Sequence, residues 1–109
     1  AFTEGLALFS SFIMLLNFPR HGKMKGMGQI ITWSIVDETM HTEAMIRIFR
    51  ILVEENKSLW NDSTKKQIYD IAEKMVELED KFIDLSFQMG TIKGLRGEEV
   101  KQSDTYKLF

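Results

Sequence analysis

Three long segments of the chain repeat their apolar residues at intervals of three and four positions, which is the period of an α-helix. The first covers residues 2–17 and ends before Pro19, which disfavours helical geometry in the residue ahead of it. This segment is apolar on nearly all sides, a pattern typical of a central helix rather than a surface one. We therefore expect it to be the buried core helix of the fold.

The second segment, residues 27–56, predicts a helix roughly 45 Å long at about 1.5 Å per residue. The third covers residues 62–89, with Asp62 or Ser63 as its expected N-terminal cap and Gly90 after its end. A glycine-punctuated loop follows, then a short helix over 98–102, whereas residues 103–109 have no clear period. The apolar stripe of the second helix comprises Ile30, Ile31, Met45, Ile48, Phe49 and Leu52, and that of the third comprises Ile68, Ile71, Ala72, Met75, Leu78, Phe82, Ile83 and Leu85.

Few residues favour strands, and the sequence has a single proline and no internal repeat. The predicted fold class is therefore all-α: an antiparallel helical bundle, or a partial bundle with three long helices and a short fourth. Because the chain begins at Ala1 within helical sequence, we interpret it as a piece of something longer.

Composition narrows the function classes. The net charge of −2 gives no basic excess for binding nucleic acid, so no nucleic-acid partner is expected. The longest apolar run, residues 6–18, is shorter than the roughly 20 residues that a membrane span needs, so no membrane association is expected. Cysteine is absent, which excludes disulfides and thiolate ligands and is compatible with a cytoplasmic protein.

Three residues in this pattern suggest metal binding. Glu38 and His41 form an E-x-x-H pair, which places the two side chains one turn apart and about 60° from each other, on the same stripe as Met45. A carboxylate and an imidazole suit iron, manganese or zinc. Antiparallel packing of the first two helices would bring Glu4 alongside. One such Glu plus an E-x-x-H pair is half the ligand set of ferritin-like dimetal carboxylate proteins, although E-x-x-H also occurs by chance on many helices.

Three stretches carry a family resemblance: FTEGLALFSSF at residues 2–12, KMKGMGQII at residues 23–31 and DETMHTE at residues 37–43. Together they resemble the small subunit of class I ribonucleotide reductase. In that family a helix glutamate precedes the glutamate of a D-E-x-x-H motif by 34 positions, and Glu4 and Glu38 are 34 positions apart. The resemblance covers residues 1–102, which we expect to form a partial ferritin-like domain, with residues 103–109 as an irregular tail.

The resemblance implies an oxidoreductase component whose dinuclear iron or manganese/iron centre generates the radical used for deoxyribonucleotide synthesis. Glu4, Glu38 and His41 would be ligands to the second metal, and Asp37 would belong to a hydrogen-bonded radical-transfer path near the site. The family's large subunit would be the partner, in the cytoplasm.

The sequence holds only three of the six ligands that the family uses, and the family's radical tyrosine has no counterpart, so the isolated chain is expected to be inactive. A complementary chain could supply the other ligands, or two copies could pool theirs in a homodimer. Two other interpretations stay open. One is a ferritin-like metal-binding or oxidase bundle with its site shared between two chains, and the other is a catalytically silent helical fragment.

Overall fold

The computed structural model describes residues 2–92 and 94–105, and these residues are almost entirely helical. The elements are the π-helix η1 (Thr3–Ala7), α1 (Phe9–Arg20), α2 (Lys25–Glu55), the short 3-10 helix η2 (Lys57–Leu59), α3 (Asp62–Gln88) and α4 (Gly97–Thr105). Extended structure within the described ranges is limited to one isolated bridge between Ile92 and Leu95. The all-α fold class is thus confirmed.

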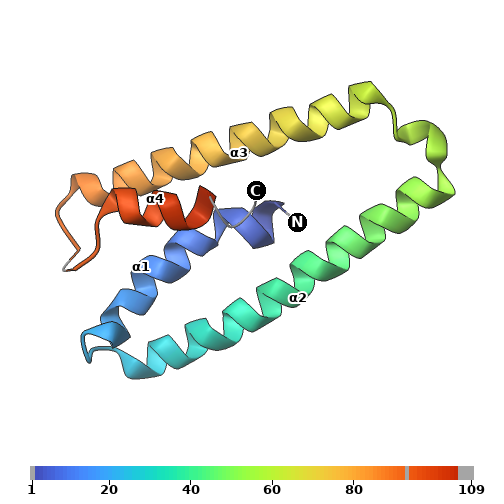
Figure 1. Ribbon diagram of the computed structural model, residues 1–109. Coiled ribbons are helices and arrows are strands. Elements are labelled where there is room, and N and C mark those ends of the chain that lie inside the picture. Colours follow the sequence, from blue (N-terminus) through green and yellow to red (C-terminus); the bar gives the residue numbers. More distant parts are fainter. Residues whose placement is uncertain (1, 93, 106–109) are drawn as a thin grey trace.

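The two longest helices, α2 and α3, run antiparallel and are joined through η2 at one end of the molecule (Figure 1). Between them lie η1, α1 and α4 (Figure 1). The segment η1 packs against both α2 and α3, while α1 packs against α2 and α4. The first helical segment therefore lies between the two longest helices, as expected for a central helix, but within residues 2–17 only Leu6, Ser10 and Asn17 are buried.

The first helical segment differs from the prediction at both ends. Its first turn, Thr3–Ala7, is a π-helix, and α1 continues through Pro19 to Arg20 instead of ending at Asn17. Because Pro19 has no N–H group, α1 lacks the hydrogen bond that this residue would donate to the carbonyl four positions earlier. The N–H of His21 closes the last turn on the carbonyl of Phe18.

Close packing at the start of α2 depends on Gly28, which is buried against Pro19. A Cβ atom at position 28 would lie 2.3 Å from Cγ of the proline ring, far inside van der Waals contact. The absence of a side chain at Gly28 thus sets how near α1 can come to α2.

The cap of α3 is Asn61, so the prediction of Asp62 or Ser63 was wrong by one or two residues. The Oδ1 atom of Asn61 accepts a hydrogen bond from the backbone N–H of Thr64 at 3.0 Å. An asparagine oxygen satisfies an N–H group that the first turn leaves without a partner.

The helix α4 extends to Thr105, further than the predicted 98–102, so residues 103–105 are helical and not irregular. The last four residues of the expected tail, 106–109, lie outside the described residues. Within the described ranges, every helix is too short or too polar to cross a membrane.

The apolar core forms where η1, α3 and α4 meet, and its fully or nearly fully buried apolar residues are Leu6, Ala72, Ile83 and Val100. The apolar stripe of α2 is not part of it: Met45, Ile48 and Leu52 are 46%, 57% and 48% exposed. The periodicity predicted the apolar face of α2 correctly, but no described element covers that part of it.

Candidate metal centre

Glu4 lies in η1, the π-helical turn that precedes α1. A π-helical turn is rare and occurs frequently at functional sites, because it changes the direction in which one side chain projects. The side chain of Glu4 is half-buried, and it lines the same pocket as Glu38 of α2.

Glu38 and His41 are one turn apart on α2, as the E-x-x-H spacing requires. Their side chains are in contact: Nδ1 of His41 lies 3.4 Å from Oε2 of Glu38. The side chain of His41 is 55% exposed and that of Glu38 is 25% exposed. The sequence placed this pair on an apolar stripe expected to be buried, whereas in this chain the pair borders solvent.

Gly5 lets η1 approach α2 closely at the level of this pair. A Cβ atom at Gly5 would lie 3.2 Å from Cγ2 of Thr42, which is tighter than an ordinary contact. The hydroxyl group of Thr42 in turn donates a hydrogen bond to the backbone carbonyl of Glu38 at 2.9 Å. Glu4 is therefore carried to the surface of α2 beside Glu38, as expected from antiparallel packing.

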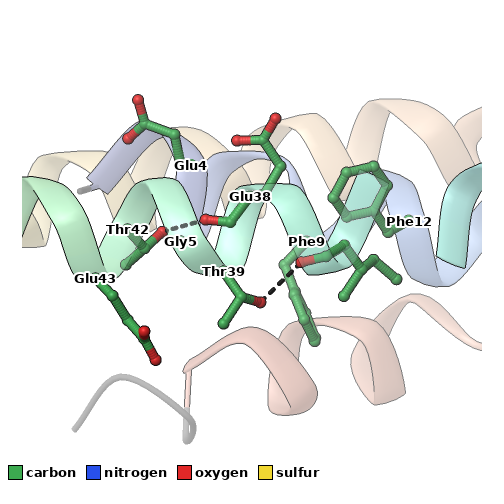
Figure 2. Close-up of a pocket in the computed structure, with 9 residues that line it drawn as sticks. Glu4, Gly5, Phe9, Phe12, Glu38, Thr39, Thr42 and Glu43 are labelled. Atoms are coloured by element: carbon green, nitrogen blue, oxygen red, sulfur yellow. Dashed lines mark hydrogen bonds between the residues drawn. The ribbon is translucent and has the colours of Figure 1, made fainter. Parts of the chain in front are cut away.

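A pocket of about 200 Å³ lies beside this contact and is lined by residues of η1, α1 and α2. Figure 2 shows the carboxyl groups of Glu4 and Glu38 pointing toward the same side, whereas the carboxyl group of Glu43 points away from them. The pocket is lined by Glu4, Gly5, Phe9, Phe12, Ile35, Glu38, Thr39, Thr42 and Glu43. Its wall is mainly apolar apart from the acids and two threonines.

These residues fit half of a metal site. Two carboxylates and an imidazole are the donor types that iron and manganese accept, and Glu4 and Glu38 come from two different elements. Within residues 2–92 and 94–105, however, no group of three or more histidine, aspartate or glutamate side chains is close enough to hold a metal ion by itself. Further ligands are needed to complete a centre.

Asp37 is exposed on α2, and it makes no hydrogen bond or ion pair with the residues that the structure describes. It is adjacent to Glu38 in sequence and points about 100° away around the helix. Its role in a radical-transfer path remains a prediction.

Two features near the centre were missed from the sequence. Gly5 follows Glu4 directly, and its lack of a side chain could have indicated a close helix approach. Glu79 is a buried acid of α3 that bonds to Ser10 of α1. Its position seven residues after Ala72 and four before Ile83 could have marked it as facing inward.

Comparison with known proteins gives a consistent family match. The family model described as ribonucleotide reductase, small chain, matches residues 1–106. The chain is 55% identical over 107 residues to a "probable ribonucleoside-diphosphate reductase small subunit" of Invertebrate iridescent virus 3, covering 97% of this chain and 28% of that protein. It is 57% identical over 91 residues to a protein of the same description in Invertebrate iridescent virus 6, covering 80% of this chain and 25% of that protein.

A bacterial relative is more distant. The "ribonucleoside-diphosphate reductase subunit beta" of Chlamydia pneumoniae is 36% identical over 93 residues, covering 85% of this chain and 27% of that protein. The chain thus spans little more than a quarter of the length of the curated relatives that it matches. No solved structure matches the chain.

Proposed function

Because the chain belongs to the ribonucleotide reductase small-chain family, we propose that it supplies one half of a dimetal centre in a ribonucleoside-diphosphate reductase small subunit. The ligands in this half are Glu4, Glu38 and His41. The observation that carries the proposal is the convergence of Glu4 from η1 and Glu38 from α2 on one pocket, with His41 in contact with Glu38.

Each of these side chains has a definite task in the proposal. Glu4 and Glu38 offer carboxylate oxygens on the same side of the pocket, and His41 offers a ring nitrogen one turn further along α2. A dinuclear iron or manganese/iron group held there would supply the redox equivalents for forming the radical that ribonucleotide reduction needs.

The residues around the ligands orient and shield them. Phe9, Phe12 and Ile35 contribute apolar side chains to the wall of the pocket beside Glu4 and Glu38. The hydrogen bond from Thr42 to the carbonyl of Glu38 ties the ligand-bearing turn of α2 to the residue that contacts η1. Asp37 is the residue we assign to the radical-transfer path, on the side of α2 next to Glu38.

The remaining ligands come, in this proposal, from a complementary segment of the subunit. Two observations support this: the chain spans 28% of a relative that is 55% identical, and the apolar stripe of α2 that continues from His41 is about half exposed. The large subunit of the reductase would be the partner in turnover, and the cytoplasm remains the predicted location.

A grafting experiment tests the proposal. This chain replaces the matching segment of the small subunit of Invertebrate iridescent virus 3, and the purified graft is loaded with Fe²⁺ or Mn²⁺ under reducing conditions. We expect two metal ions per subunit, and a lower metal content in Glu38→Gln and His41→Ala variants. Glu43→Gln is the matched control, since Glu43 lines the same pocket but points away from Glu4 and Glu38. Full metal content in the Glu38→Gln and His41→Ala variants would instead support a silent fragment.

A homodimer with a pooled site is the second candidate, because two copies would provide four carboxylates and two histidines. Metal content and native mass of the ungrafted chain separate it from the first. Two metal ions per two chains in a species of dimer mass would establish the pooled site, and a metal-free monomer would exclude it.

A further inference from the structure

A buried hydrogen bond joins α1 to α3 beside the candidate centre. The hydroxyl group of Ser10 donates to Oε1 of Glu79, although the two residues are 69 positions apart in the sequence. Ser10 is 0% exposed and Glu79 is 7% exposed. Both partners are thus buried, and they belong to different helices.

Burying the acid requires compensation, since transfer of a carboxyl group out of water is unfavourable unless it is neutral or well bonded. Burial raises the pKa of Glu79, and the neighbouring Asp80 raises it further, while the bond from Ser10 acts in the opposite direction. The cation that α4 brings to this side, Lys101, is paired with Asp84 at 2.7 Å. Burial and the nearby negative charge of Asp80 both oppose ionisation of Glu79, and the hydroxyl of Ser10 is its hydrogen-bonding partner.

The location of Ser10 places its hydrogen bond with Glu79 beside the π-helical segment η1. Ser10 is the second residue of α1 and follows η1, the π-helical turn that carries Glu4, after a short junction at Leu8. A π-helical turn is less favourable than an α-helical one, so contacts from outside the helix must maintain it. The segment η1 packs on α3 as well as on α2, and the bond between Ser10 and Glu79 lies just beyond that contact.

We propose that Glu79 is a positioning residue: through Ser10 it fixes η1 against α3 and so sets Glu4 beside Glu38. The functional part of this inference rests on the proposed role of Glu4 as a ligand. The structural part, a clasp between Ser10 and Glu79, does not.

Distance measurements on the metal-free chain test the clasp. Because the chain has no cysteine, a cysteine pair at the exposed positions Thr3 and Glu73 can carry spin labels for pulsed electron paramagnetic resonance. We expect a narrow distance distribution in the parent chain and in Glu79→Gln, whose amide oxygen still accepts from Ser10. Glu79→Ala and Ser10→Ala should broaden and shift it. A distribution that is already broad in the parent, or equally narrow in all variants, would overturn the clasp.

Controls separate local positioning from general destabilisation. Glu77→Gln changes another acid of α3, one that accepts hydrogen bonds from Lys74 and Lys81 of the same helix, and should leave the distribution narrow. A second label pair at Arg20 and Gln29 reports on the junction of α1 and α2, and it should be unchanged in every variant. Equal broadening at both label pairs would reduce Glu79 to an ordinary stability residue.

Metal affinity tests the functional part. In the grafted subunit, Glu79→Ala and Ser10→Ala should weaken Mn²⁺ binding by about 10- to 100-fold, the usual effect of losing a group that orients a ligand, and Glu79→Gln should restore it. Unchanged Mn²⁺ affinity in Glu79→Ala, with His41→Ala impaired, would overturn the positioning role. A graft that binds no Mn²⁺ would overturn Glu4 as a ligand, while the label distances would still decide the clasp.

Discussion

Gly28→Ala should move α1 away from α2, and the structure allows the size of the effect to be worked out. The new Cβ would lie 2.3 Å from Cγ and 3.1 Å from Cβ of Pro19, whose ring is part of the backbone and cannot rotate aside. Overpacking of this kind costs about 1–3 kcal/mol, and the rigid ring places this site near the upper end. Replacing glycine by alanine inside a helix recovers about 1 kcal/mol.

The two terms leave Gly28→Ala less stable than the parent chain by about 1–2 kcal/mol. Gly26→Ala is the matched control, since Gly26 lies in the same first turns of α2 and a Cβ there meets nothing within 4 Å. This control should be unchanged or more stable by up to about 1 kcal/mol. Urea unfolding followed by circular dichroism measures both differences as shifts of the midpoint at constant slope.

A double variant identifies the contact responsible. Removing the ring with Pro19→Ala should restore most of the stability lost in Gly28→Ala, because the clash needs both partners. If Gly28→Ala were as stable as Gly26→Ala, or if Pro19→Ala failed to restore it, the contact between α1 and α2 would not be limited by these two residues.

Three further predictions follow from other contacts. Lys74, together with a second lysine, donates hydrogen bonds that lower the pKa of Glu77 to about 2. A lowered folded pKa contributes stability above the unfolded value of 4.5 that is lost as pH falls toward 2, so a ¹³C carboxyl titration should give a midpoint near 2 that rises in Lys74→Ala. Burial raises the pKa of Glu79, so its proton stabilises the folded chain at low pH, and this contribution is lost as pH rises above 4.5. Glu79→Gln, which does not titrate, should therefore gain stability relative to the parent chain as pH rises, and the midpoints of urea unfolding measure this difference. Gly5→Leu should push η1 away from Thr42 and weaken Mn²⁺ binding by the grafted subunit about 10-fold or more. The control is Thr42→Ser with Gly5 unchanged, which keeps the hydroxyl group and should bind Mn²⁺ normally.

The order and extents of the helices were predictable because helical periodicity is a local property of the sequence. Two of the exceptions arise where a contact with another element decides the geometry. The π-helical turn at Thr3–Ala7 carries no local signal, and it lies where η1 meets both α2 and α3. The extension of α1 through Pro19 likewise accompanies the close packing of that ring on Gly28.

The candidate site was predictable to the same degree. Antiparallel packing of the first two helices predicted that Glu4 would lie beside Glu38, and both residues line one pocket. Glu79 was not found, because an acid on a helix rich in lysine and glutamate resembles a solvated surface residue. Its burial depends on a hydroxyl group that Ser10 contributes from another helix.

The exposed stripe of α2 links the stability of the chain to the chemistry of its site. Met45, Ile48 and Leu52 are each about half exposed, and full burial of such a side chain contributes about 1.5–3 kcal/mol, so roughly 1 kcal/mol at each position is still available. Glu38 and His41 lie on the same stripe, and the side chain of His41 is 55% exposed. A segment that covers the stripe would therefore remove water from these two candidate ligands as it buries the apolar residues. Because a carboxylate attracts a cation more strongly in such a drier environment, assembly of the bundle and tight metal binding should occur together.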